Sequence, residues 1–219
     1  MNTTIRILLA LCVATLLALG TASADVTSAG SGNWSSTTPN APWPGGTLPG
    51  PTDNVIIRSV DTVTIDIAAT CAGLTVNGVF QYSKTALVDL AINGNLTVST
   101  GATFKVQTAT TSFSGPHTLT ITGDITNSGT VFDMRSGTAG STLGVINITF
   151  AGSTNNTVTM NPAFSSTNGE FNGITINKTG NGKVILGSDM YIAGGSSTGL
   201  QTMTSILTFL NGIVETGNF

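Results

Sequence analysis

Short runs in which apolar and polar residues alternate follow one another along most of the chain. In residues 62–67, for example, Val63, Ile65 and Ile67 are apolar and the residues between them are polar. Such alternation predicts a strand with one buried face, and the Gly, Asn or Ser that ends each run favours a turn. No stretch after the N-terminal segment has a convincing helical period. The sequence therefore predicts an all-β fold.

Several of these runs end in a common pattern of apolar-x-apolar-polar-Gly, with copies at 74–78, 90–94, 119–123, 148–152, 174–180 and 207–212. The glycines that close the last five copies follow one another after 29, 29, 28 and 32 residues, whereas the first step, from Gly78 to Gly94, is 16 residues. A unit near 30 residues with two or three strands suits one coil of a solenoid, because stacked coils share a core and pair their strand edges. We therefore expect a right-handed parallel β-helix over residues 54–219. A β-sandwich is the alternative, since it also has short strands and frequent turns.

The alternation also predicts which side chains form the core of the solenoid. One apolar face should run through all repeats, with strands of successive repeats parallel and adjacent. Its members are expected to be Val63, Ile65, Leu90, Ile92, Leu119, Ile121, Ile148, Ile174 and Ile176. Cys71 lies between small residues with no basic neighbour in sequence, so we expect a small buried residue and not a reactive thiol.

Residues 25–53 differ from the repeats because they contain both tryptophans and five of the seven prolines. A solenoid needs an atypical unit over its first coil. We therefore expect residues 25–53 to be an irregular N-terminal cap. The alternative is that Trp34 and Trp43 lie on an exposed ledge and stack against the sugar rings of a ligand.

The N-terminus has the pattern of a secretory signal peptide. Arg6 precedes an apolar run at 7–19, and Ala22-Ser23-Ala24 supplies the small-residue cleavage pattern. The run is too short to cross a bilayer comfortably, although an uncleaved anchor is the alternative. We expect residues 1–24 to be removed, no later membrane span, and a protein that is secreted or held at the cell surface.

The charge balance excludes two classes of partner. Charged residues make up 8% of the chain, against about 25% in an average globular protein, and the net charge is −3. Nucleic acid would require a basic stripe, and anionic membranes attract polybasic segments. We expect neither partner, and a surface built from Thr, Ser and Asn.

A search for catalytic and metal-binding residues finds little. His117 is the single histidine, expected in a solvated loop, so no histidine-based metal cluster can form. No nucleophile elbow and no phosphate-binding loop occurs. The acidic residues are expected to be solvated strand or turn residues, without the close pairing that glycoside hydrolysis needs. They are Asp61, Asp66, Asp89, Asp124 and Asp133. We therefore expect no enzyme activity, no cofactor and no metal.

Threonine pairs with one residue between them raise the possibility of a regular hydroxyl array that binds ice. They occur at 62 and 64, at 118, 120 and 122, and at 157 and 159. In the sequence these pairs do not recur at one fixed position in each repeat. We therefore expect them to be ordinary exposed strand residues of a chain with few charges.

Four segments together resemble the opening of the eight-glycine domain family: 31–34, 48–57, 63–66 and 71–78. Residues 171–178 are similar to the repeats that follow in such proteins, which are large secreted bacterial repeat proteins, many with a C-terminal sorting domain. The resemblance implies a β-rich extracellular module with a role in polysaccharide binding or adhesion. Two departures stand out: residues 58–61 replace the small-residue turn of the family, and the chain contains no sorting domain.

Three functions remain open from the sequence. The first is a non-enzymatic structural or adhesive β-solenoid, which we favour. The others are a carbohydrate-binding module and the non-catalytic part of a polysaccharide-degrading enzyme. The expected partners are an extracellular polysaccharide, a host or neighbouring cell surface, and further domains of the same polypeptide. Because residues 207–219 begin another repeat and stop within it, we expect a truncated C-terminus that associates end to end.

Overall fold

The computed structural model describes residues 24–107, 116–134, 145–161, 171–188 and 207–216. These residues form β-strands and one short 3-10 turn, η1 (Pro44–Gly46). No α-helix occurs in the described ranges, and none of their elements is a helix long and apolar enough to span a membrane.

The strands form three sheets, here called A, B and C. Sheet A contains β1 (Asp25–Thr27), β3 (Asn54–Ile57), β6 (Gly73–Val76), β9 (Leu96–Val98), β12 (Ile125–Asn127), β15 (Asn156–Met160), β17 (Lys183–Leu186) and β19 (Ile213–Thr216). Sheet B contains β2 (Gly32–Asn33), β4 (Thr62–Ile65), β7 (Val79–Tyr82), β10 (Thr103–Val106) and β13 (Val131–Asp133). Sheet C contains β5 (Ala69–Cys71), β8 (Asp89–Ile92), β11 (His117–Ile121), β14 (Ile146–Phe150), β16 (Gly173–Asn177) and β18 (Leu207–Asn211).

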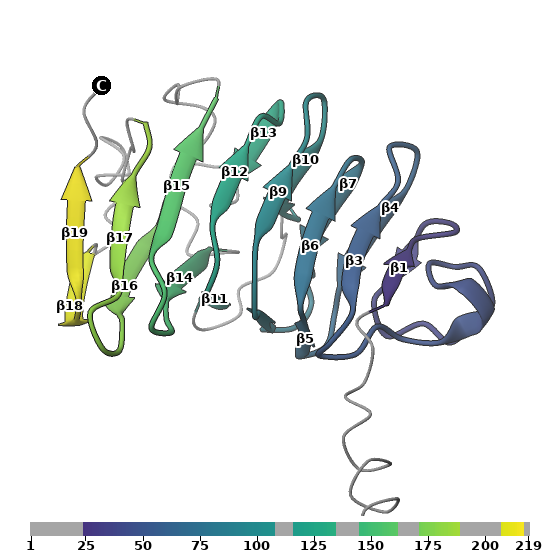
Figure 1. The fold of residues 1–219 in the computed structure, drawn as a ribbon. Coiled ribbons are helices and arrows are strands. Elements are labelled where there is room, and N and C mark those ends of the chain that lie inside the picture. The colour runs from purple at the N-terminus through teal and green to yellow at the C-terminus, as the bar shows by residue number, and fades with distance from the viewer. Residues whose placement is uncertain (1–23, 108–115, 135–144, 162–170, 189–206, 217–219) are drawn as a thin grey trace, which may run out of the picture.

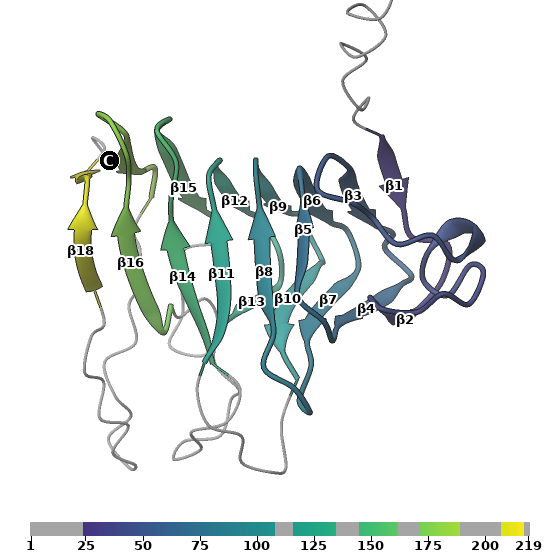
Figure 2. The same cartoon turned by 90° about the horizontal axis from the view of Figure 1, so that it is seen from below.

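Neighbouring strands pair in parallel in all three sheets, so the chain is a parallel β-helix. From the second coil on, each coil begins in sheet A and ends in sheet C, and the coils stack along one axis (Figure 1). Sheet C is seen as a continuous row of strands from β5 to β18 in Figure 2. The all-β solenoid prediction is confirmed, and the β-sandwich alternative is wrong because it would require antiparallel strands.

The repeated glycine pattern has a structural explanation. Gly94 and Gly123 follow β8 and β11 and lie against each other at the corner where sheet C leads into sheet A. A Cβ atom on Gly123 would lie 2.4 Å from the carbonyl carbon of Gly94, so only glycine permits this approach. Gly78 instead follows β6, at the corner between sheets A and B. The first spacing is short because that copy of the pattern belongs to a different corner.

One apolar core runs the length of the described coils. All nine residues predicted from the alternation are buried. On sheet B, Phe80, Phe104 and Phe132 occupy one register position, and their rings stack with centroids 5.5 and 5.2 Å apart. Cys71 is buried as predicted, and burial raises the pKa of its thiol to about 12. The thiol therefore stays protonated and unreactive at neutral pH.

The N-terminal segment is more regular at its start than predicted. β1 pairs with β3, and β2 pairs with β4, so residues 25–33 already form part of a coil. Residues 34–53 then lie across the end of the solenoid in place of a strand in sheet C. We call residues 34–53 the cap crossing.

Both tryptophans are interior residues of this end unit. Trp34 is 1% exposed and Trp43 is 0% exposed, with ring centroids 4.9 Å apart in an edge-to-face arrangement. Trp43 Nε1 donates to the carbonyl oxygen of Trp34 at 2.7 Å. Trp34 also contacts Phe80, with the ring centroids 6.2 Å apart, and so continues the aromatic stack. The exposed sugar-stacking ledge is therefore wrong, because neither ring offers a face to a ligand.

Two polar residues expected in solvent are buried. His117 is the first residue of β11 and is 0% exposed, with its ring 5.1 Å from that of Tyr82. Asp61 is 4% exposed and accepts hydrogen bonds from Ser28 Oγ at 2.6 Å and Arg58 Nε at 2.8 Å. Burial tends to raise the pKa of Asp61, but these hydrogen bonds hold it below its ordinary value. Residues 58–61 are thus a turn closed by the ion pair between Arg58 and Asp61.

Burial of His117 predicts a loss of stability in mild acid. Its Nδ1 accepts from the backbone N–H of Val88 at 3.1 Å, which requires a neutral ring. Burial lowers the pKa of His117 from 6.5 to about 4, so between these values the unfolded chain binds the proton first. The stabilisation that depends on neutral His117 should be fully present above pH 6.5. The free energy of unfolding should then fall by about 3 kcal/mol as the pH approaches 4. Urea denaturation across this range measures the loss.

The matched variant for this prediction is His117→Gln, which keeps a polar side chain and removes the titration. Its free energy of unfolding should vary much less between pH 6.5 and pH 4. Asp61 contributes to the pH dependence of stability only at lower pH. Its pKa in the folded protein lies below the ordinary value of 3.8, so its stabilising effect is lost as the pH falls below that value. A slope that is equal in wild type and variant would contradict the assignment to His117.

The last described strands present apolar side chains to solvent. The exposed fractions are 53% for Phe209, 66% for Leu210 and 55% for Ile213. Exposed apolar side chains on unpaired strand edges favour association with other strands. The expectation of end-to-end association stays a prediction.

Candidate functional site

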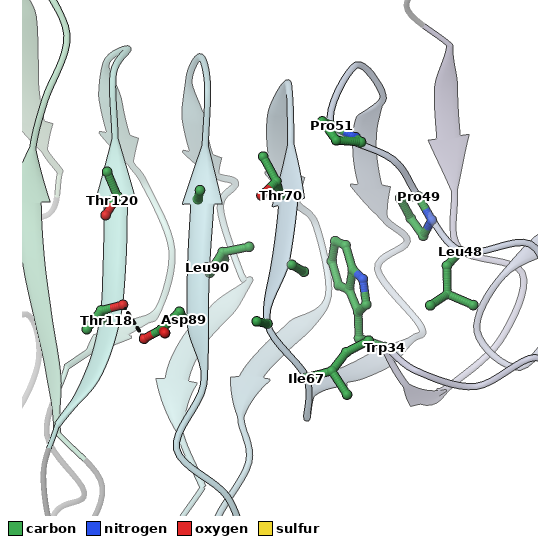
Figure 3. Close-up of a pocket in the computed structure, with 13 residues that line it drawn as sticks. Trp34, Leu48, Pro49, Pro51, Ile67, Thr70, Asp89, Leu90, Thr118 and Thr120 are labelled. Atoms are coloured by element: carbon green, nitrogen blue, oxygen red, sulfur yellow. Dashed lines mark hydrogen bonds between the residues drawn. The ribbon is translucent and has the colours of Figure 1, made fainter.

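Sheet C begins one coil later than the other two sheets. Sheets A and B each have a strand from the first coil, β1 and β2, but β5 pairs with β8 alone among the described strands. The place of a preceding strand in sheet C is taken by the cap crossing. Between the cap crossing and β5 lies a hollow of about 370 Å³ (Figure 3). We call this hollow the cap groove.

The cap groove has a floor of small side chains and one apolar wall. Thr70, Ala91 and Thr120 share one register position on β5, β8 and β11, and all three line the groove. The wall is formed by Leu48, Pro49 and Pro51 of the segment 48–51. Ile67 lies at the lower end and is 39% exposed.

A carboxylate and a hydroxyl lie together in the groove. Asp89 precedes Leu90 on β8, and Thr118 occupies the same register position on β11. Thr118 Oγ1 donates to Asp89 Oδ1 at 2.6 Å, the dashed line in Figure 3. The Asp89 side chain is exposed, and it is the single charged residue among those that line the groove. The cap groove therefore offers a carboxylate and several hydroxyls beside an apolar wall.

The groove floor continues as a row of threonines across the whole of sheet C. Successive strands pair so that one outward position is threonine on five of six strands: Thr70, Ala91, Thr120, Thr149, Thr175 and Thr208. We call these residues the threonine row. Adjacent parallel strands lie ~4.8 Å apart, so the row presents a hydroxyl at this interval over much of its length.

The threonine row is a regularity that the spacing in sequence hides. Single threonines recur at this position on five of the six strands of sheet C, whereas the pairs of threonines do not recur, as the sequence predicted. The connections that lead into sheet C differ in length. From the end of β7 at Tyr82 to the start of β8 at Asp89 is seven residues, whereas from the end of β10 at Val106 to the start of β11 at His117 is eleven. Equal positions on the sheet are therefore unequally spaced along the chain.

The outward position beside the threonine row is not uniform. It holds Asp89, Thr118, Asn147 and Gly173 on successive strands. The described part of sheet C thus has one column of threonines and not the two-column array that would suit a crystal surface such as ice.

Sheet A carries a comparable set of threonines. Thr75, Thr97, Thr126 and Thr159 share one outward register position on β6, β9, β12 and β15. Thr75 and Thr97 of this row line a second hollow, of about 480 Å³, that no residue of the cap crossing lines. The row on sheet A therefore supplies an internal control for the role of the cap crossing beside the threonine row of sheet C.

Several acidic residues that the structure describes are held by local hydrogen bonds and ion pairs. Asp61 is engaged with Arg58, and Asp66 accepts from the backbone N–H and the hydroxyl of Ser35 at 3.0 and 2.6 Å. Asp124 Oδ1 accepts from the backbone N–H of Thr157 at 2.7 Å. In the ranges that the structure describes, no group of three or more His, Cys, Asp or Glu residues could hold a metal ion.

Of the residues predicted to contact a ligand, Trp34 lies at the back of the cap groove but is buried, and Trp43 does not line it. The groove residues Thr70, Asp89 and Ala91 were not predicted as ligand contacts. The alternation of the sequence predicts that these three side chains point outward. It does not predict that they lie close together, because their positions depend on the register between coils and on the path of the cap crossing.

Comparison with known proteins gives one match. The sequence model of the G8 domain matches residues 42–181, which is more than half of the chain. The match begins within the cap crossing and ends just before β17, so it includes every residue that lines the cap groove except Trp34. G8 is a family of extracellular domains. No curated protein and no solved structure matches the chain.

Proposed function

The chain belongs to the G8 domain family, and from that premise we propose that it is a non-enzymatic structural and adhesive module of a secreted or cell-surface protein, with an extracellular polysaccharide as its ligand. The observation that carries the proposal is the cap groove, which opens onto the threonine row of sheet C.

The shape of this surface suits a linear polymer. A ligand that lies along the solenoid axis would meet equivalent hydroxyls at ~4.8 Å, which is comparable with the length of one sugar ring. The cap groove would hold its end against Pro49 and Pro51, and its volume of about 370 Å³ lies within the range of small-molecule sites. Apolar side chains would contact the faces of the sugar rings, while Asp89 and the threonine hydroxyls bond to their hydroxyl groups.

The electrostatics of the chain favour a neutral ligand over a charged one. Charged residues are 8% of the sequence, and the groove contains a single carboxylate, Asp89. A polyanion would be repelled by Asp89 and would find no basic residue among those that line the groove. The same single carboxylate supports the absence of glycosidase activity, because that chemistry uses two carboxylates.

Export remains part of the proposal. β1 begins at Asp25, directly after the cleavage site expected after Ala24, and its backbone pairs with β3. A mature chain that starts at Asp25 would therefore keep every strand of sheet A. This supports residues 1–24 as a removable signal peptide.

Filling the cap groove should weaken polysaccharide binding. Ala91 lies on the floor with its side chain outward, so Ala91→Trp would place an indole in the hollow. In affinity electrophoresis against a panel of neutral and acidic polysaccharides, the wild-type chain should be retarded by at least one neutral polymer. Ala91→Trp should bind that polymer at least about tenfold more weakly, which corresponds to about 1.4 kcal/mol.

The matched control is Thr97→Trp, which adds an indole to the outward face of sheet A. It should be retarded as strongly as the wild-type chain. No retardation by any polysaccharide would refute the proposed function. Equal weakening by both substitutions would show that binding, where present, does not involve the cap groove.

A further inference from the structure

A buried lysine lies at the corner where sheet C leads into sheet A. Lys178 directly follows β16 and is 0% exposed. Its Nζ donates to the carbonyl oxygen of Ala151 and to Oδ1 of Asn156, a residue that is also 0% exposed. Within the described part of the chain, no carboxylate forms an ion pair with this amine.

The surroundings hold the two side chains in place. Asn156 Nδ2 donates to the carbonyl oxygen of Gly123, which fixes the orientation of the carboxamide. The stem of Lys178 is enclosed by two glycines of the next coil. A Cβ atom on Gly182 would lie 2.9 Å from Lys178 Cε, and one on Gly212 would lie 2.8 Å from Lys178 Cβ. The lysine therefore has little room to leave the carboxamide.

A charged ammonium is unfavourable in such a place. Taking an ion out of water costs free energy that hydrogen bonds to neutral groups repay incompletely. Burial lowers the pKa of Lys178 below its ordinary value, which favours the neutral amine. A neutral amine has a free electron pair and is the nucleophilic form of lysine.

We propose that Lys178 and Asn156 join in an intramolecular isopeptide bond. The neutral Nζ attacks Cγ of Asn156, the Nζ–Cγ bond forms, and the Cγ–Nδ2 bond breaks. The proton that Nζ loses passes to the departing nitrogen, which leaves as ammonia, so no oxidant, reductant or cofactor is needed. The product is a neutral secondary amide whose N–H can still donate to Ala151. The bond would link the first residue of β15 to the residue that follows β16.

This inference is independent of the polysaccharide proposal, because the two sites share no residue. Its role would be mechanical and protective. A covalent link between the start of β15 and the end of β16 closes the coil that they bound, which limits local opening and unfolding under tension. Such a link suits an adhesive module outside the cell.

Intact mass spectrometry of the full chain under denaturing conditions tests the bond. The wild-type protein should be lighter than its sequence by one ammonia molecule. Trypsin should fail to cut after Lys178 while still cutting after the exposed Lys183, and the resulting peptide should carry the same mass deficit. Lys183→Gln, which removes an exposed lysine paired with Glu215, should keep the deficit.

Two variants distinguish the isopeptide from other losses of ammonia, such as succinimide formation at asparagine. Lys178→Gln and Asn156→Ser each remove one reacting group, and both should have the full mass that their sequences give. A wild-type chain of full mass that trypsin cuts after Lys178 overturns the proposal, even if the variants fold poorly. A deficit that persists in Lys178→Gln overturns it as well.

Discussion

Replacing Phe104 by alanine should destabilise the protein by about 3–5 kcal/mol, because a buried aromatic side chain is removed and a cavity remains. Phe104 is 0% exposed and lies between Phe80 and Phe132 in the stack of sheet B. Its ring also contacts Tyr82 edge to face, with centroids 6.1 Å apart. The loss therefore affects three successive coils. Equilibrium denaturation in urea at neutral pH measures it.

The control is an apolar residue outside the core. Val60 is 80% exposed, and Val60→Ala should change the free energy of unfolding by less than about 0.5 kcal/mol. Phe104→Leu fills part of the cavity and should lose clearly less than Phe104→Ala. A Phe104→Ala variant as stable as Val60→Ala would show that the stacked rings are not the centre of the core.

Replacing Trp34 by alanine should have a comparable effect, about 3–5 kcal/mol, concentrated at the N-terminal end. Trp34 touches both Trp43 and Phe80, and its carbonyl oxygen accepts from Trp43 Nε1. Without the indole, the cap crossing loses the ring contacts of Trp34 with Phe80 and Trp43. Limited proteolysis should then cut within residues 34–53, and urea denaturation should give the overall loss.

Trp34→Phe is the matched variant for the cap. It keeps an aromatic ring against Phe80 and leaves the backbone carbonyl for Trp43, so it should lose less stability and resist proteolysis in residues 34–53. If Trp34→Ala is as resistant to protease as the wild type, the tryptophans do not hold the cap crossing in place.

The faces of the strands could be predicted from the sequence, but the register between coils could not. Alternation assigns Val63, Ile65, Leu119 and Ile121 to the interior because side chains on a strand change sides at each residue. The threonine row instead depends on which strand lies beside which. The connections between sheets vary in length, so equal positions on sheet C are unequally spaced in sequence.

The predictions for polar residues at the corners between sheets were wrong for a different reason. Asp61 and His117 have the parity of the buried residues in the adjoining strands, but polar side chains at the ends of apolar runs predict exposure to solvent. Asp61 and His117 both lie at the ends of runs, and both are buried because neighbouring groups satisfy them. Lys178 lies at a corner as well, and its charge gave no indication of burial.

The position of the cap groove could not be predicted from the sequence either. The tryptophans and prolines of residues 25–53 indicated an end unit, which suggested a ligand ledge on the tryptophans themselves. In the structure the rings turn inward, and the wall of the cap groove includes Pro49, which is buried, and Pro51, which is exposed. The ligand-facing surface arises where the cap crossing replaces a strand, which is a property of the path of the chain and not of any one motif.

The most direct measurement of the central claim is methyl NMR of threonine-labelled protein, titrated with an oligosaccharide of the polymer that retards the wild-type chain. The account predicts that the methyl signals of Thr70, Thr120, Thr149 and Thr175 shift on sheet C. The signals of Thr75, Thr97, Thr126 and Thr159 on sheet A should stay in place. Shifts on sheet A with sheet C unchanged would contradict the claim that the cap groove and the threonine row are the binding surface.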